Sequence, residues 1–176
     1  KYSLGLDNAG LYYPVFKGDK TAKLLDRAFK KTILGKLHPE LYVAKAASPV
    51  VEILQSVSAE LKIDQIYTGL TTSSPGFFAA EGRKVGRLRP IFSLDQFIEQ
   101  MSAFSCQGWR IINHEMETSI LFRLLHEQLG YQAGALCLVL DNVRSNEVIS
   151  PALYHQRLDL AIKIALNSLV RLSLGQ

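Results

Sequence analysis

Three short segments between residues 71 and 117 carry the side chains that could do chemistry. They are Thr71-Thr72-Ser73-Ser74, Phe77 to Arg83, and Asn113-His114-Glu115-Met116-Glu117. The second segment offers an aromatic face on which a base can stack, and an acid and a guanidinium two residues apart for the polar edge of that base. The third offers Glu-Met-Glu, whose carboxylates can accept hydrogen bonds from sugar hydroxyls. Together the segments predict a nucleoside-binding site.

The order and spacing of these segments resemble the uridine phosphorylase branch of the nucleoside phosphorylase family. That branch reads a pyrimidine with a Phe-x-x-x-Gln-x-Arg loop and holds the ribose with Glu-Met-Glu. Leu6 to Tyr13 resembles the strand and turn after the family's phosphate-binding half, and Leu153 to Leu172 resembles its last helix. The chain departs from the family in two ways. Glu81 stands where the family has Gln, and the amino-terminal half, with its Gly-Asp-Pro phosphate loop and phosphate arginines, is missing.

The resemblance implies a role for each matching residue of the base site. Phe77 would stack on the base, while Glu81 and Arg83 would bind its edge. Arg83 would also be catalytic, because it would stabilise the negative charge that builds on the departing base. Arg144 matches a family arginine that supports the base-binding loop. A plainer alternative for Glu81 and Arg83 is a weak surface ion pair.

Ribose binding is implied for Glu115, Met116 and Glu117. Two residues at i and i+2 of one helix point apart, so both acids reach one sugar only if Glu115 precedes the helix. The alternative is that acids simply favour the amino end of a helix. Thr71 and Thr72 end a predicted strand, where open α/β sheets place ligands, and are candidates for the phosphate side of the site or for turn caps.

Glu81 leaves the identity of the base open. An ionised carboxylate only accepts hydrogen bonds, whereas Gln both donates and accepts. Glu81 could take the ring N–H of uracil, but its second oxygen would repel a base carbonyl unless Glu81 is protonated or paired with Arg83. Purine-specific members carry an Asp after a Ser near the last strand, where this chain has Ser145-Asn146. That difference, together with Arg83, favours a pyrimidine.

The remaining reactive side chains predict no metal site. His38, His114, His126 and His155 are scattered along the sequence, and we expect them to be structural. Cys106 and Cys137 lack metal-type spacing and lie in apolar surroundings, which predicts two buried thiols and a reducing compartment. No phosphate-loop or dinucleotide motif occurs. We therefore expect no cofactor, and we expect inorganic phosphate as the co-substrate.

Length and composition predict one domain over residues 1–176. The chain is 48% hydrophobic and carries a formal net charge of +4. Its basic residues are dispersed apart from a short cluster between Arg83 and Arg89, which argues against a nucleic-acid surface. No apolar run is long enough to span a bilayer, so we expect a cytoplasmic protein without membrane contact.

Alternating apolar runs and amphipathic stretches predict an α/β fold, a three-layer sandwich with a mixed central sheet flanked by helices. Ser48 is the predicted N-cap of a helix to about Leu61, and Ser93 with Gln96 predicts a capping box and a helix to about Cys106. A helical stripe from Met116 should stop at Gly130. The last helix should follow Pro151. The strands expected are residues 1–6, 63–71, 109–112 and 133–140, and the last of these should be a central strand covered on both faces. Outside the strands and helices, we expect a turn or strand edge at 11–14, a Lys-rich insert at 17–36 and a loop at 71–89.

The resemblance implies an enzyme, a pentosyltransferase that cleaves a uridine-like pyrimidine ribonucleoside with phosphate in nucleoside catabolism or salvage. The family shares site residues between subunits, so the expected partners are the nucleoside, phosphate and further copies in a dimer or hexamer. Because the phosphate half is missing, we expect the isolated 176-residue chain to be inactive and its full-length parent to be active. The alternatives are a nucleosidase and a non-catalytic nucleoside-binding or structural domain.

Overall fold

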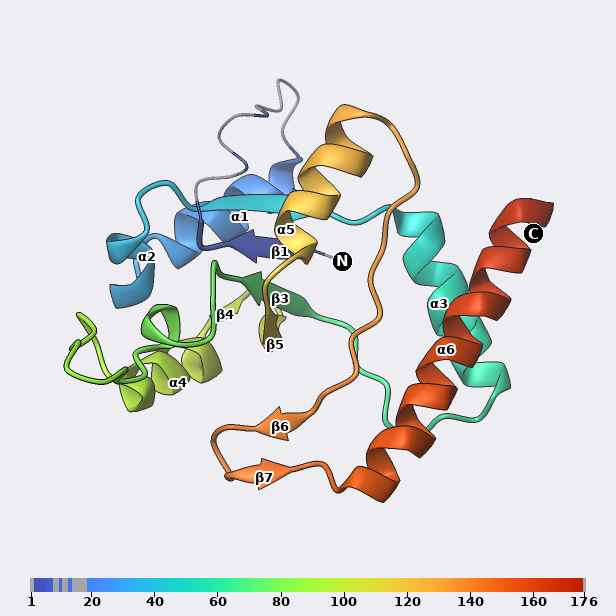
Figure 1. Ribbon diagram of the computed structural model, residues 1–176. Coiled ribbons are helices and arrows are strands. Elements are labelled where there is room, and N and C mark those ends of the chain that lie inside the picture. Colours follow the sequence, from blue (N-terminus) through green and yellow to red (C-terminus); the bar gives the residue numbers. More distant parts are fainter. Residues whose placement is uncertain (1, 8–9, 11–12, 14–18, 176) are drawn as a thin grey trace.

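The computed structural model describes residues 2–7, 10, 13 and 19–175. A five-stranded sheet lies at the centre in the order β2-β1-β3-β5-β4 (Figure 1). The strands β1 (Tyr2–Gly5), β3 (Leu70–Ser73) and β5 (Trp109–Glu115) are parallel. β2 (Tyr42–Lys45) and β4 (Ser105–Cys106) join antiparallel at the two edges, so the predicted mixed sheet is confirmed.

Helices cover both faces of the sheet. On one face lie α1 (Lys20–Phe29), α2 (Ile33–Leu37) and α4 (Leu94–Ala103). On the other face lies α5 (Thr118–Leu121), which continues as the π-helix η3 (Phe122–Gln128). α3 (Ser48–Glu60) and α6 (Pro151–Leu174) pack along each other beside the sheet (Figure 1). The predicted α/β class is confirmed.

Two apolar clusters hold these layers together. The larger lies between the sheet and α1, α2 and α4, and its fully buried members include Leu4, Phe29 and Leu70. The smaller lies on the other face, where Ala44 of β2 meets Phe122 of η3. Alternate side chains of a strand point to opposite faces, so β2 contributes Val43 to the larger cluster and Tyr42 and Ala44 to the smaller one.

Local capping chemistry explains where several helices begin. The Ser93 hydroxyl accepts from the amide of Gln96, and the Gln96 side-chain oxygen accepts from the amide of Ser93. The predicted capping box of α4 is therefore confirmed. Ser150 caps α6 through the amide of Leu153. Ser48 is the first residue of α3 rather than its N-cap. Ala47 takes that place without a side-chain bond.

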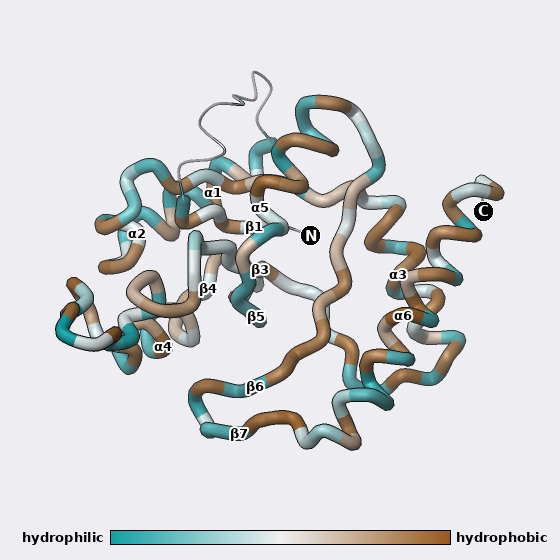
Figure 2. Tube along the Cα trace, viewed as in Figure 1, coloured by the Kyte–Doolittle hydropathy of each residue, from teal (hydrophilic) through white to brown (hydrophobic). Residues whose placement is uncertain are grey.

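The predicted central strand at residues 133–140 was wrong. The segment is extended but pairs with no strand, and it runs as an apolar stretch between η3 and β6 (Asp141–Asn142) (Figure 2). Its backbone accepts a hydrogen bond at each end, at Ala133 from the amide of Ala47 and at Leu140 from the amide of Ile149. Val139 is 60% exposed and Leu140 is 50% exposed. An apolar run records hydrophobicity, but a strand also needs a partner strand, and none of the five strands of the sheet pairs with this segment.

Smaller differences concern element ends. Residues 63–69 form no strand, because a turn with Lys62 at φ 52° follows α3 and β3 begins only at Leu70. α4 stops at Ala103, since Gln107 and Gly108 have the positive φ values of a tight hairpin that pairs β4 with β5. Met116 precedes α5 instead of lying on it. The predicted turn at 11–14 lies outside the described residues except for Tyr13, and the described part of the 17–36 insert is mostly helical.

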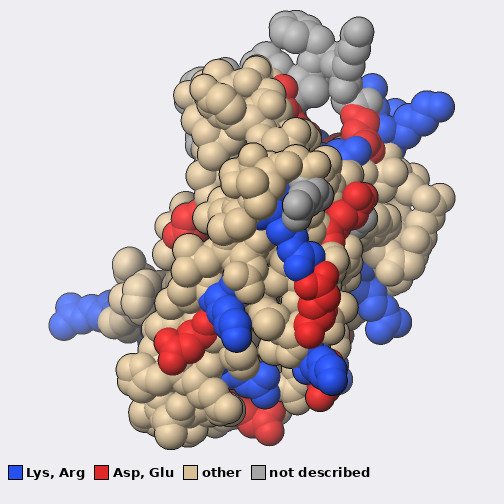
Figure 3. Space-filling view, turned by 90° about the vertical axis from the view of Figure 1, so that its right-hand side faces the viewer, with Lys and Arg blue, Asp and Glu red and all other residues tan. Residues whose placement is uncertain are grey.

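The prediction that both thiols are buried was also wrong, because Cys106 is half-buried and Cys137 is exposed. On the face over α3 and α6, acidic and basic side chains lie side by side rather than gathering by sign (Figure 3). Arg171 of α6 pairs there with Glu60 of α3. Within the described ranges, no helix has the length and apolar content needed to cross a membrane.

Candidate functional site

A bulge in β5 decides which side chains reach each face at the carboxyl end of the sheet. Leu70 of β3 pairs with Ile111, yet the next residue, Thr71, pairs with Asn113, so Ile112 is the extra residue. Ile111 therefore faces the larger apolar cluster, and His114 faces the same way, packing against α4. Asn113 and Glu115 turn to the α5 face. His114 and Glu115, as neighbours in a strand, point to opposite faces, and the bulge decides which face each of them takes.

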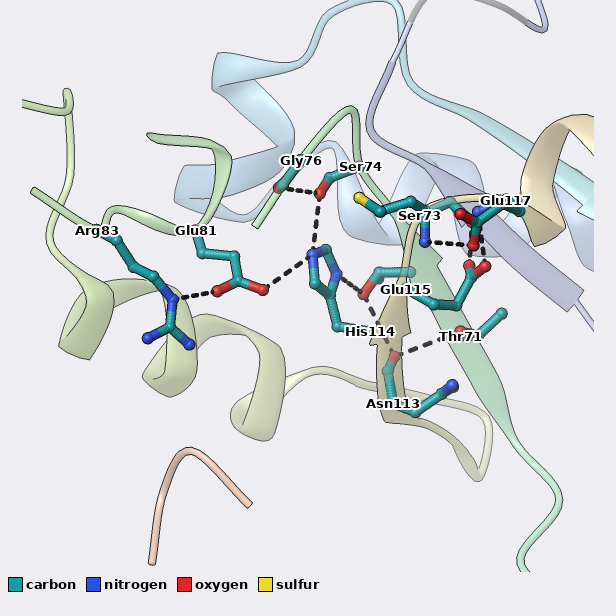
Figure 4. A network of polar contacts seen from close by, with 12 residues as sticks. Thr71, Ser73, Ser74, Gly76, Glu81, Arg83, Asn113, His114, Glu115 and Glu117 are labelled. Carbon is teal, nitrogen blue, oxygen red and sulfur yellow. Dashed lines mark hydrogen bonds and ion pairs between the residues drawn. The ribbon is translucent and has the colours of Figure 1, made fainter. Parts of the chain in front are cut away.

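Glu81 and Arg83 form an ion pair on the α4 side of this edge (Figure 4). The Nε of Arg83 donates to Oε2 of Glu81 at 2.6 Å. The Glu81 side chain is only 6% exposed, so this is not the weak surface pair of the plainer alternative. Gly82, at φ 79°, makes the tight turn between them and lies so close to the start of α4 that a Cβ would meet the Ser93 carbonyl carbon at 2.4 Å.

His114 lies between this pair and β3. Its Nδ1 is 2.8 Å from Oγ1 of Thr72, and its Nε2 is 2.9 Å from Oγ of Ser74 and 3.5 Å from Oε1 of Glu81. Burial lowers the pKa of His114 to about 4, and the attraction of nearby Glu115 offsets this only in part. His114 is therefore neutral at pH 7. Phe77 packs edge-on to its ring with centroids 6.0 Å apart and is itself 42% exposed.

On the opposite side of β5, the Glu115 carboxylate accepts several hydrogen bonds from its neighbours (Figure 4). Its Oε2 accepts from the amides of Glu117 and Thr118 at 2.7 and 2.8 Å, as a cap at the start of α5. Its Oε1 accepts from the hydroxyls of Ser73 and Thr118. Ser3 completes this buried cluster. The Glu115 carboxylate is therefore fully engaged within the protein.

Glu117 and Met116 are exposed just beyond the strand. The Met116 amide donates to Oε2 of Glu117 at 3.3 Å, and this is the hydrogen bond that the described structure records for that carboxylate. Met116 is 38% exposed. Of the three predicted ribose residues, Glu117 and Met116 remain accessible to a ligand, while Glu115 positions them.

Of the other predicted residues, Thr71 and Arg144 lie apart from this group, whereas Thr72 contacts it through His114. Thr72 is fully buried and bonded to His114, whereas Thr71 faces a cavity of about 430 Å³ between the sheet, α3 and the 133–140 segment. Arg144 is exposed in the turn between β6 and β7 (Glu147–Val148), where it lines a second cavity of about 410 Å³ against α4. Phe77, Glu81 and Glu117 line neither of these two cavities.

Sequence reasoning missed two members of the site, His114 and Ser74. The signal was available in their placement. His114 stands next to Glu-Met-Glu near the end of one strand, and Ser74 follows the end of a neighbouring strand. Parallel neighbouring strands bring such ends together, so the pair could have been predicted to meet.

No protein-family model matches this sequence, and no curated protein does. Among solved structures, a Trypanosoma brucei nucleoside phosphorylase that shows uridine phosphorylase activity is similar, with a TM-score of 0.81 and 25% sequence identity. The similarity covers 96% of this chain and 56% of that one, so this chain spans little more than half of that structure's length. Fold and motifs agree, and the resemblance of this chain to the nucleoside phosphorylase family is confirmed.

Proposed function

We propose that this chain supplies the base- and ribose-binding part of a nucleoside phosphorylase acting on a uridine-like pyrimidine ribonucleoside. The observation that carries the proposal is the arrangement at the carboxyl end of β3 and β5. There, the Glu81–Arg83 pair and an accessible Glu117 lie on either side of one strand end. The activity of the similar T. brucei structure supports the class of reaction.

The ion pair would remove the repulsion expected between the second oxygen of Glu81 and a carbonyl of uracil. The Oε2 atom is taken by Arg83, so Oε1 is left to accept the ring N–H. The terminal nitrogens of Arg83 have no partner within the described part of the chain and can donate to a uracil carbonyl. The pair therefore offers one acceptor beside donors, which is the pattern that a Gln amide offers alone. Phe77 would stack on the base with its exposed face.

Glu117 would accept the vicinal 2′- and 3′-hydroxyls of ribose, with Met116 packed against the sugar. A phosphate oxygen would attack C1′ as the bond from C1′ to the base breaks, and the electron pair of that bond would leave with the base. Arg83 would stabilise the negative charge gained by the base carbonyl. The base would then take a proton from solvent, leaving free base and ribose 1-phosphate.

The test is release of uracil from uridine by the product of the natural open reading frame, with inosine and a phosphate-free reaction beside it. Uracil release that requires phosphate would support the proposal. Release without phosphate would indicate a nucleosidase instead. No release from either nucleoside, with no binding of uridine, would contradict the proposal.

A further inference from the structure

The loop after Arg83, residues 84–91 and here called the basic loop, combines unpaired charge with exposed apolar side chains. It projects beyond α4, and basic and apolar residues alternate along it (Figures 1 and 2). Its cations are Lys84, Arg87 and Arg89. Within the described ranges, none of these cations forms an ion pair. Leu88 is 73% exposed and Ile91 is 86% exposed. Apolar side chains with a charged rim are typical of a contact surface.

The basic loop has a defined conformation. The Leu88 amide donates to the carbonyl oxygen of Val85 at 3.0 Å, and Gly86 between them has a φ of 57°. A Cβ at Gly86 would meet nothing within 4 Å, so a neighbouring molecule can approach the tip of the turn. Behind the loop, Phe92 stacks on Phe97 of α4, with ring centroids 6.2 Å apart. A turn that is already shaped loses little conformational entropy when it binds a partner.

A cleft of opposite charge, here called the α4 cleft, lies beside α4. It has a volume of about 410 Å³, and the turn between β6 and β7 forms its second wall. Asp95 and Glu99, one helical turn apart on α4, line it together with the apolar Ile98 and Val143. Neither acid forms an ion pair in the part of the chain that the structure describes. Arg144 also lines the cleft, so its acids outnumber its cations by two to one.

The basic loop does not fill the α4 cleft of its own chain. None of residues 84–91 lines that cleft. The loop nevertheless leads directly into α4, so the two surfaces are neighbours on the molecule. Two copies related by a two-fold axis can therefore place each loop in the cleft of the other, and the contact is made twice. An anionic membrane would pair with the loop alone and leave the acids of the cleft without partners, so the surfaces fit a second copy better.

We propose that two copies of this protein associate by this exchange, with the basic loop of each copy in the α4 cleft of the other. The cations of the loop would pair with Asp95 and Glu99, while its apolar side chains would cover Ile98. Complementary charge would set the register of the contact. Because the loop begins directly after Arg83, association would also hold that end of the base-binding segment in place. The inference goes beyond the proposed function, since association can be measured without a nucleoside.

The test uses two charge-reversed forms of the product of the natural open reading frame, studied by sedimentation velocity. The loop form carries Lys84→Glu and Arg87→Glu, and the cleft form carries Asp95→Lys and Glu99→Lys. The wild type should be a dimer, and the dissociation constant of each form alone should rise by about tenfold or more. The control is Lys163→Glu, an exposed charge reversal on α6, which should leave the dissociation constant unchanged.

Mixing the two forms distinguishes a lost contact from damage to the fold. In the mixture, the acidic loop of one form meets the basic cleft of the other, and the unchanged loop meets the unchanged cleft, so the dimer should return. A monomeric wild type would overturn the inference, as would a dimer that persists in both forms or forms that stay apart when mixed. If circular dichroism shows that the cleft form is unfolded, Glu99→Lys alone takes its place, with the same outcomes expected. Loss of the dimer and loss of uracil release are separate readouts, so this inference and the proposed function can fail independently.

Discussion

Acidification should destabilise this protein through His114. An exposed histidine has a pKa of about 6.5, and burial lowers the pKa of His114 to about 4. The unfolded chain therefore binds the proton more tightly, so the free energy of unfolding falls as pH drops below about 6.5, until the folded protein also takes up the proton near pH 4. The difference between the two pKa values corresponds to about 3 kcal/mol in total, of which about 2 kcal/mol is reached at pH 5.

The measurement is urea denaturation at pH 7 and pH 5, followed by the fluorescence of Trp109, the single tryptophan of the chain. The control is His114→Gln, because Gln keeps a donor and an acceptor but does not titrate. Burial also lowers the pKa of His38 and raises the pKa of Glu127, but both groups are present in both proteins, so their contributions cancel. The wild type should lose about 2 kcal/mol more than His114→Gln between the two pH values. Equal losses in the two proteins would refute the buried, neutral state of His114.

Three further tests use substitutions in and around the site. In the product of the natural open reading frame, Arg83→Ala should lower kcat and kcat/KM for uridine together by about 10²- to 10³-fold, and an unchanged kcat would contradict the role of Arg83 in the transition state. Glu117→Gln should weaken uridine binding without changing the urea midpoint, whereas Glu115→Gln should lower the free energy of unfolding by about 2 kcal/mol, because it weakens the capping bonds of that carboxylate. If the two substitutions had the same effects on uridine binding and on stability, the different roles given to Glu117 and Glu115 would be refuted. Gly82→Ala should lower the thermal midpoint far more than Gly86→Ala, since both have positive φ but only a Cβ at Gly82 meets backbone; equal shifts would contradict that packing.

Local signals in the sequence were sufficient for several parts of this protein. The capping box at Ser93 predicted the start of α4, because capping depends on residues three or four apart, and Pro151 predicted the start of α6. Phe77, the 81–83 pair and Glu-Met-Glu, in their order along the chain, predicted a family resemblance that the similar fold supports. Motif types and their spacing are properties of the chain alone, so they need no tertiary structure to be recognised.

The tertiary structure decided what each of those residues faces. Periodicity alone predicts neither the bulge at Ile112, which turns His114 toward Glu81 and Glu115 toward α5, nor the burial of Glu81. The exposed apolar run at 133–140 shows the same limit, because hydrophobicity does not specify a pairing partner. Strand register and long-range packing join residues far apart in sequence, so they are settled only when the whole chain folds.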